Sequence, residues 1–432
     1  MKQRLSALIR RPFVRSVATV ATGAAASHAV ALAFAPLITR LYGPEAYGLQ
    51  GVFSSVVGIV AVAAALGYPT AIVLPRDDGD ALALVRLSLG IGAGATLLTA
   101  LLLPLLGTSL LALFNAQAII EHMYWIPPAV LAVVVGRVLA YWLIRQQAYA
   151  LGARFQVFTS LLVGSVKCGA GLMSPTVSML IAANTLGSLL GSVLTFFSWR
   201  KSTRYGLPTV VAPLRRVAYA HRDFPLLRAP QDLINTVSQS LPLLLLAATF
   251  GASAAGQYAI AIAVLGVPAA LIGNSVSAVF YPRITQAVLA GENVRSQILR
   301  ATASLAATGA LPFLLVLALG PWLFEMVFGA AWRGAGTYAQ WLAPWLFMQF
   351  INPPAVAAVP VLRLQHGLLM YELLSTGSKA FALWLGFVLF GSDLAAIALF
   401  SVIGVLAYAW LIGWVMWRSA KPSPIQAVGA GL

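Results

Sequence analysis

The sequence predicts an all-α polytopic membrane protein with about twelve transmembrane helices, in two parallel six-helix bundles around a central cavity. Three observations lead to this prediction: the composition, the recurrence of long apolar runs, and landmarks that repeat between the two halves. Of the 432 residues, 60% are hydrophobic and 9% are charged, whereas an ordinary soluble domain carries roughly a quarter charged residues. Most of this chain is therefore not expected to face water.

The apolar runs are about 20 residues long, enough for a helix to cross a hydrocarbon core of roughly 30 Å. These spans must be helical, because lipid cannot satisfy free backbone groups and the uniform Leu/Ala/Val/Gly runs lack the alternation of barrel strands. The expected spans cover residues 16–38, 48–70, 83–106, 124–144, 155–173, 177–199, 229–249, 257–279, 300–320, 338–360, 366–390 and 394–416.

The basic residues predict the orientation of these spans. An even number of spans places both termini on one side of the membrane. Of the 27 Lys and Arg residues, Arg40 and Arg333 fall on the side opposite the termini, Arg137, Lys167 and Lys379 fall inside spans, and all others lie on the side of the termini. Cytoplasmic connections carry such an excess, so both termini are expected in the cytoplasm. Anionic inner-leaflet lipid then accounts for the net charge of +16, and no nucleic-acid partner is expected.

Two landmarks recur between the halves of the chain. Gly43 to Gly48 follows the first span and Gly251 to Gly256 follows the seventh, at an offset of 208 residues. Each pair precedes an apolar span that ends in a Pro-Arg dipeptide, Pro75-Arg76 or Pro282-Arg283. Transporters are often duplicated bundles, so this register indicates an internal repeat. The alternative is that short reversals between membrane helices generally use Gly or Pro.

The expected domain boundaries follow from this repeat. Residues 1–205 form an N-terminal six-helix bundle, residues 206–225 a basic cytoplasmic connecting loop, and residues 226–432 a C-terminal six-helix bundle. Because six is an even number, both copies keep the same orientation, related by an axis along the membrane normal.

The run from Thr39 to Gly48, Thr-Arg-Leu-Tyr-Gly-Pro-Glu-Ala-Tyr-Gly, resembles the lipid-linked oligosaccharide flippases of the O-antigen and exopolysaccharide type. The run from Phe250 to Tyr258 is similar to that family's second-half counterpart. The family belongs to the multidrug/oligosaccharidyl-lipid/polysaccharide exporter superfamily, which also holds multidrug extruders and the peptidoglycan precursor flippase. The resemblance covers nearly the whole chain, and its motifs mark the fold better than the substrate.

The resemblance implies a flippase of the bacterial inner (plasma) membrane. It would move undecaprenyl-pyrophosphate-linked oligosaccharide from the cytoplasmic to the periplasmic leaflet by alternating access, for surface polysaccharide biosynthesis. The implied partners are this polyprenyl-pyrophosphate-linked glycan, membrane lipid and other surface-polysaccharide assembly proteins. No cofactor or metal is expected. Family members carry cations in the central cavity, but no motif fixes their positions.

The three cations inside spans are therefore the candidate substrate-binding residues, together with Arg228 at the start of the seventh span. A charge at the bilayer centre costs about 2.5 to 3.5 kcal/mol on insertion scales, so Arg137, Lys167 and Lys379 should face a wet cavity or a partner. Arg137 shares a helical stripe with Tyr141 and Arg145, and a guanidinium can hold a pyrophosphate. The alternative is that Arg137 and Lys167 snorkel or bond backbone carbonyls.

Two carboxylates are candidates for ion coupling. Asp232 lies on a polar stripe with Arg228, Asn235 and Gln239, and it either exchanges a coupling ion or neutralises Arg228 one turn earlier. Glu372 precedes Lys379 by two turns. It is a second ion-coupling candidate, or the partner of Lys379 in an internal charge pair.

Two other functions stay open. A multidrug or other amphiphile exporter would share the fold, although a basic cavity repels cationic drugs. A membrane glycan polymerase or ligase would need catalytic groups gathered outside the membrane, and the few charged residues expected there are spread over separate short loops. The sequence also lacks a Gly-rich phosphate loop with Lys-Ser/Thr. The chain is therefore not expected to be an enzyme.

Overall fold

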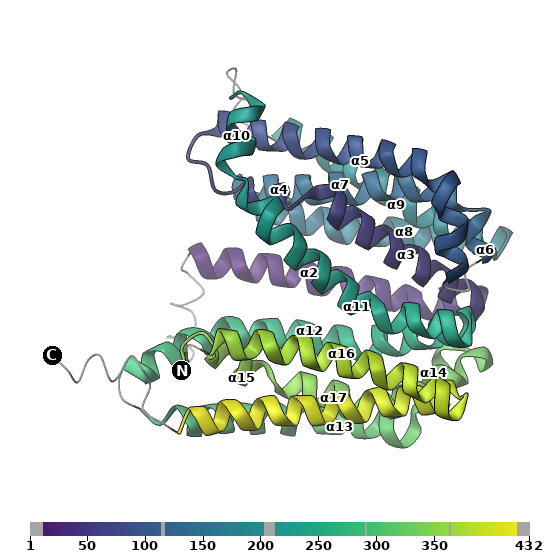
Figure 1. The fold of residues 1–432 in the computed structure, drawn as a ribbon, viewed down its shortest axis with the longest axis vertical. Coiled ribbons are helices and arrows are strands. Elements are labelled where there is room, and N and C mark those ends of the chain that lie inside the picture. The colour runs from purple at the N-terminus through teal and green to yellow at the C-terminus, as the bar shows by residue number, and fades with distance from the viewer. Residues whose placement is uncertain (1–11, 114–116, 203–211, 290–291, 363, 421–432) are drawn as a thin grey trace. The chain divides into compact units, whose positions relative to one another are not determined.

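The computed structural model describes residues 12–113, 117–202, 212–289, 292–362 and 364–420, and every regular element in these ranges is a helix (Figure 1). The helices are α2 (Pro12–Leu41), α3 (Pro44–Ala65), α4 (Tyr68–Ala71), α5 (Asp78–Leu113), α6 (Gln117–Ile120), η1 (Met123–Trp125), α7 (Ile126–Arg145), α8 (Tyr149–Met173), α9 (Val177–Ser202), α10 (Leu214–Ala220), η2 (Phe224–Arg228), α11 (Ala229–Phe250), α12 (Ala252–Leu289), α13 (Val294–Phe328), η3 (Ala330–Trp332), α14 (Arg333–Ile351), α15 (Pro353–Ala358), α16 (Gln365–Phe390) and α17 (Asp393–Arg418).

The twelve expected spans all fall on helical segments. Ten helical stretches in the described ranges are long and apolar enough to cross a membrane, and α12 adds the shorter apolar stretch Ala252–Gly266. The expected span at 338–360 is divided between α14 and α15 at Asn352. The all-α polytopic fold class is therefore confirmed.

The chain forms two compact units, residues 1–256 and 257–432. Helix α11, which follows the connecting segment, packs along α3 in the first unit. Consequently these units do not divide the chain where the expected repeat does, and the predicted boundaries at 205 and 226 stay a prediction. Part of the connecting loop, residues 203–211, lies outside the described residues.

Helices α2 and α8 pack side by side in the first unit through small residues. A Cβ on Gly164 would lie 2.5 Å from the Phe34 ring, and one on Gly171 would lie 2.8 Å from the Tyr42 ring. Both contacts follow the same chain direction, so the helices are parallel. This agrees with the expectation that the first and fifth spans cross the membrane in the same direction, and small residues allow such close packing in lipid.

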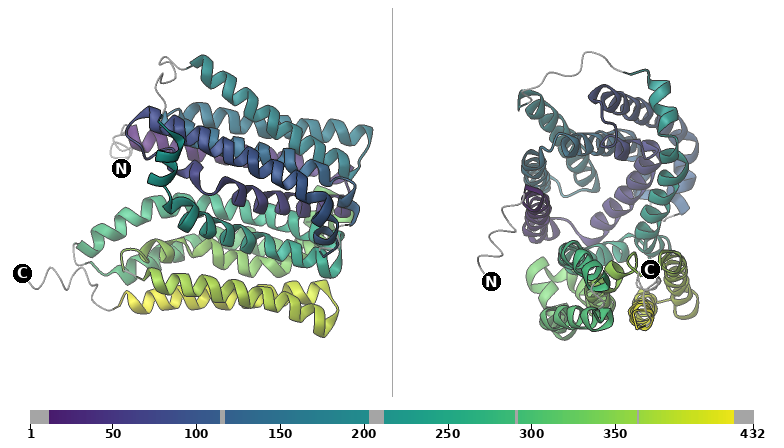
Figure 2. Two further views of the ribbon diagram at one scale, coloured as in Figure 1. Left: turned by 45° about the horizontal axis from the view of Figure 1, so that its top comes forward. Right: turned by 90° about the vertical axis from the view of Figure 1, so that its left-hand side faces the viewer.

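Helix α7 lies at the centre of the first unit, in contact with α3, α5 and α9. Figure 2 shows these helices nearly end-on in its right-hand view. The core that joins them includes Phe53 of α3, Val130 of α7, Ile181 of α9 and Leu244 of α11, each at most 4% exposed. This packing fixes the position of α7, which carries Arg137 and Arg145.

The two glycine turns meet in the first unit. Gly43 precedes α3, and Gly251, with a φ of +87°, precedes α12. Helices α3 and α12 therefore begin at the same place in each copy of the expected repeat. They then differ: α3 ends at Ala65, where Leu66 and Gly67 adopt the left-handed conformation, while α12 continues through Pro282-Arg283 to Leu289.

The second unit is built on two hairpins, α13 with α14 and α16 with α17, and α14 also packs on α17. Local capping fixes where two of these helices begin. The Asn293 side chain accepts a hydrogen bond from the Ser296 amide at 3.0 Å, and Ser392 caps α17 in the same way. Capping satisfies amides that have no partner within the helix.

Candidate functional site

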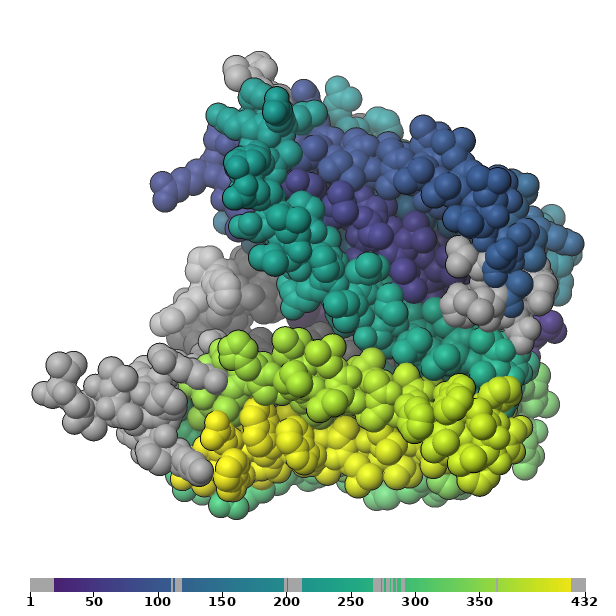
Figure 3. Space-filling view, viewed as in Figure 1, coloured from purple at the N-terminus to yellow at the C-terminus, as the bar shows by residue number. Residues whose placement is uncertain are grey.

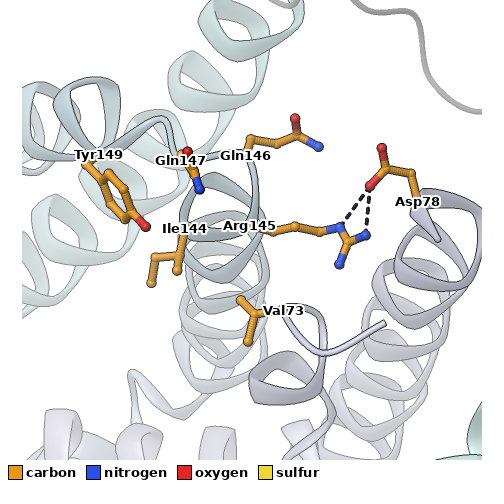
Figure 4. A pocket seen from close by; sticks show the side chains of 7 residues that line it. All are labelled: Val73, Asp78, Ile144, Arg145, Gln146, Gln147 and Tyr149. Atoms are coloured by element: carbon orange, nitrogen blue, oxygen red, sulfur yellow. Dashed lines mark hydrogen bonds and ion pairs between the residues drawn. The ribbon is translucent and has the colours of Figure 1, made fainter. Parts of the chain in front are cut away.

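Arg145 is an almost fully buried cation at the C-terminal end of α7, with a side chain only 10% exposed. Its guanidinium donates to Asp78 Oδ1 at 3.0 and 2.8 Å, and to the carbonyl oxygens of Ile72 and Pro75 at 3.2 and 2.6 Å. Four hydrogen bonds therefore tie the segment between α4 and α5 to the end of α7. Figure 4 shows the two that join Arg145 to Asp78. Arg145, which shares the predicted helical stripe with Arg137, thus has a structural role.

A pocket of about 540 Å³ lies beside this ion pair, at the end of the first unit expected to face the cytoplasm. Val73, Asp78 and the turn from α7 to α8 line it: Ile144, Arg145, Gln146, Gln147 and Tyr149. Asp78, the two glutamines and Tyr149 are not among the site residues predicted from the sequence. No motif marks them, because they converge only when α5, α7 and α8 pack.

Arg137 is half-buried on α7, and it makes no hydrogen bond or ion pair with any described residue. It precedes Arg145 by eight residues, which places it ~12 Å further along the helix axis. The predicted alternative, in which Arg137 bonds a backbone carbonyl, is not found among the described residues. Arg137 is thus a cation at membrane depth without a counter-charge from this part of the chain.

Lys167 is half-buried on α8, six residues before the end of that helix at Met173. Its backbone carbonyl accepts a hydrogen bond from the Tyr42 hydroxyl at 3.0 Å. Its ammonium group has no hydrogen-bond or carboxylate partner in the described ranges. A short turn joins α7 and α8 at the end expected to face the cytoplasm. Lys167 lies farther from this turn than Arg137 does, and therefore nearer the membrane face opposite the cytoplasm.

Arg228 and Asp232 form the ion pair that was predicted as one of two roles for Asp232, with Nε and Oδ1 3.1 Å apart. The Asp232 side chain is 17% exposed and that of Arg228 is 50% exposed. One turn on, the Gln239 amide donates to Asn235 Oδ1 at 3.1 Å. The expected polar stripe on α11 therefore exists, and α11 lies on the surface of the first unit (Figure 3).

Lys379 lies on α16 in the second unit and does not pair with Glu372. Within the described ranges no carboxylate lies within 4.0 Å of its ammonium, and Glu372 is exposed. Instead, the Lys379 Nζ lies 5.4 Å from the ring centroid of Trp345 and 5.9 Å from that of Phe400. Aromatic faces attract cations. The alternative of an internal Lys379–Glu372 pair is therefore not found in the described residues, and the ammonium lies near two rings from α14 and α17 instead.

The described residues contain no group of three or more His, Cys, Asp or Glu side chains that could hold a metal ion. The candidate residues form separate sets: Arg137, Lys167, Arg228 and Asp232 in the first unit, and Glu372 and Lys379 in the second. In the first unit, the residues that come together from different helices are those that line the Arg145–Asp78 pocket.

The fold is that of multi-pass transporters of the MOP superfamily. An inward-facing multidrug resistance MATE family transporter of this superfamily matches with a TM-score of 0.71 at 16% identity, over 91% of this chain and 94% of that one. An outward-facing structure of such a transporter matches with a TM-score of 0.62 at 16% identity, over 94% and 95%. The lipid II flippase MurJ, in an inward closed conformation, matches with a TM-score of 0.68 at 11% identity, over 92% and 87%.

Residues 37–336 match the model of a family described as polysaccharide biosynthesis protein. The chain therefore belongs to the polysaccharide biosynthesis protein family. No curated protein matches it. The family that the turns at Gly43 and Gly251 indicated is thus confirmed.

Proposed function

We propose that this protein is a flippase that moves undecaprenyl-pyrophosphate-linked oligosaccharide from the cytoplasmic to the periplasmic leaflet for surface polysaccharide biosynthesis. The family links the chain to polysaccharide biosynthesis, and the fold is one used for transport. The protein spans the bacterial inner membrane with both termini in the cytoplasm. It acts without chemistry on the glycan, by alternating access between two six-helix bundles, residues 1–205 and 226–432.

The observation that carries this proposal is the Arg137 guanidinium, which lies at membrane depth without a partner in the described chain. Burying an unpaired cation is costly, so a site that retains one must offer it water or an anion. A pyrophosphate bridge supplies that anion, and a guanidinium can hold two of its oxygens at once. A neutral or cationic cargo offers no such compensation.

The other cations complete the proposed binding set. Lys167, Lys379 and Arg228 would contact the pyrophosphate at successive stages, since Lys167 lies farther from the turn between α7 and α8 than Arg137 does. Asp232 would exchange a coupling ion when Arg228 turns to substrate, because the two side chains neutralise each other in this structure. Glu372 is the second coupling candidate.

The test is genetic complementation followed by mass analysis of lipid-linked intermediates. Cells lacking the protein should accumulate an undecaprenyl-pyrophosphate-linked glycan, and the wild-type protein should clear it. Arg137→Ala should reach the membrane without clearing the glycan. Arg154→Ala removes an exposed arginine from the start of α8 and should behave as wild type. Absence of accumulation would indicate a multidrug exporter, and full clearance by Arg137→Ala would remove Arg137 from the mechanism.

A further inference from the structure

We propose that the Arg145–Asp78 pocket is a saccharide-binding subsite that holds the neutral glycan of the lipid-linked substrate at the cytoplasmic face. This inference rests on the proposed function and names the part of the substrate that the pocket contacts. Its volume of about 540 Å³ falls in the range of about 300–1,000 Å³ common for small-molecule sites.

The pocket presents hydrogen-bonding groups that have no partner in the described chain. The side-chain amides of Gln146 and Gln147 and the Tyr149 hydroxyl make no hydrogen bond to any described residue. An amide offers both donors and an acceptor, and a phenol offers one of each. Neighbouring hydroxyls on a sugar ring both donate and accept, so these groups match a saccharide.

The charges of the pocket are paired with each other, which favours a neutral ligand over an anion. Arg145 uses four hydrogen bonds on Asp78 and two backbone carbonyls, out of the five N–H donors of a guanidinium. The Asp78 side chain is 60% exposed, so its carboxylate would repel a phosphate while it can still accept from a hydroxyl. The pocket therefore suits the uncharged sugar, and the diphosphate must bind elsewhere, at Arg137 in the proposed function.

The backbone of Gln147 offers a way to remove the side chain of this pocket residue without disturbing the fold. Its φ is +54°, and only Leu66 shares a positive φ among the non-glycine residues of the described chain. Glycine takes this left-handed conformation without strain, whereas a residue with a Cβ does so at a cost. This left-handed residue caps the C-terminus of α7, where the Ala148 amide donates to the Leu143 carbonyl at 2.9 Å, as left-handed residues at helix ends commonly do. Figure 4 shows the Gln147 side chain beside Gln146 and Tyr149 on the pocket wall. A glycine at position 147 would remove this side-chain amide from the pocket.

Gln147→Gly separates a binding role from a structural role. The substitution removes the amide and relieves the strained backbone, so thermal stability should stay equal or rise. Leu66→Gly is the matched control, because it relieves the same strain at φ +47° outside the pocket. Neither variant should lose its fold.

The measurement is affinity for two lipids in detergent: the undecaprenyl-pyrophosphate-linked glycan that accumulates in cells lacking the protein, and undecaprenyl pyrophosphate itself. We expect Gln147→Gly to bind the glycosylated lipid about three- to tenfold more weakly, as loss of one or two hydrogen bonds implies. Its affinity for the sugar-free lipid should equal that of wild type and of Leu66→Gly. If Gln147→Gly binds the glycosylated lipid as tightly as wild type, or binds both lipids more weakly to the same degree, the proposed subsite is wrong. The proposed flippase function would not be affected by either result. Failure of the wild type to bind either lipid would overturn the flippase itself.

Discussion

Gly48 and Gly256 lie backbone against backbone, and each occupies the space that a side chain on the other would need. A Cβ on Gly48 would lie 1.7 Å from the Ala252 carbonyl oxygen, and a Cβ on Gly256 would lie 1.9 Å from the Pro44 carbonyl oxygen. Pro44 and Ala252 are the first residues of α3 and α12, so the contact is reciprocal between equivalent positions. A two-fold relation between repeats produces such a self-complementary contact, and the contact therefore supports the internal repeat.

Gly48→Ala and Gly256→Ala should each destabilise the protein. The added methyl would meet a backbone carbonyl that cannot move aside, so the free energy of unfolding should fall by about 1–3 kcal/mol, as overpacking does. Gly43→Ala, in the same turn, meets nothing within 4 Å and should leave stability unchanged. Thermal unfolding of the three variants in detergent checks this. Equal stability of Gly48→Ala and Gly43→Ala would contradict the contact.

The seam between α2 and α8 should be equally intolerant of added volume. Gly164→Ala pushes a methyl toward the Phe34 ring, whereas Gly169→Ala on the same helix meets open space. We expect Gly164→Ala to lower the melting temperature by a few degrees and Gly169→Ala to leave it within error. If both variants melt together, α2 and α8 do not pack as described.

Removing the Arg145 side chain should destabilise the end of the first unit. Arg145→Met leaves two carbonyl oxygens and Asp78 without their donor, at a cost of about 1–3 kcal/mol. Arg145→Lys should recover little, because an ammonium cannot reproduce the planar fork that reaches three acceptors. Urea or thermal unfolding compares both variants with Arg154→Gln, which should match wild type. Full rescue by lysine would show that charge alone matters there.

Lys379 should be coupled energetically to Trp345 and not to Glu372. A double-mutant cycle of Lys379→Met with Trp345→Leu should give a coupling energy of about 0.5–2 kcal/mol, the range of cation–π contacts. The cycle of Lys379→Met with Glu372→Gln should give a value near zero. Unfolding free energies of the single and double variants supply both numbers, and the reverse ranking would restore the charge pair.

Helix positions were predictable from the sequence because the membrane imposes one period and one length on every span. The expected span at 338–360 was divided at Asn352, where α14 gives way to α15. Pro353 and Pro354 follow this residue, and proline favours the first turn of a new helix over the interior of a continuing one. The Arg228–Asp232 pair was predictable as well, since helical spacing brings residues four apart together.

Partners from distant elements were not predictable. Lys379 lies over Trp345 and Phe400, which belong to other helices, and no local spacing connects the three. The pocket likewise joins Asp78 to Gln147 across two helices. The left-handed backbone of Gln147 has no sequence signal, because glutamine rarely adopts it.

The most direct test of the flippase is translocation in proteoliposomes that contain the purified protein and its undecaprenyl-pyrophosphate-linked glycan. The fraction of this lipid exposed on the outer leaflet is followed over time. We predict equilibration with wild type and with Arg154→Ala, and a rate about tenfold or more lower with Arg137→Ala, because charge-assisted contacts to the pyrophosphate are lost. Failure of the wild type to move the lipid, or equal rates for wild type and Arg137→Ala, would contradict the proposed mechanism.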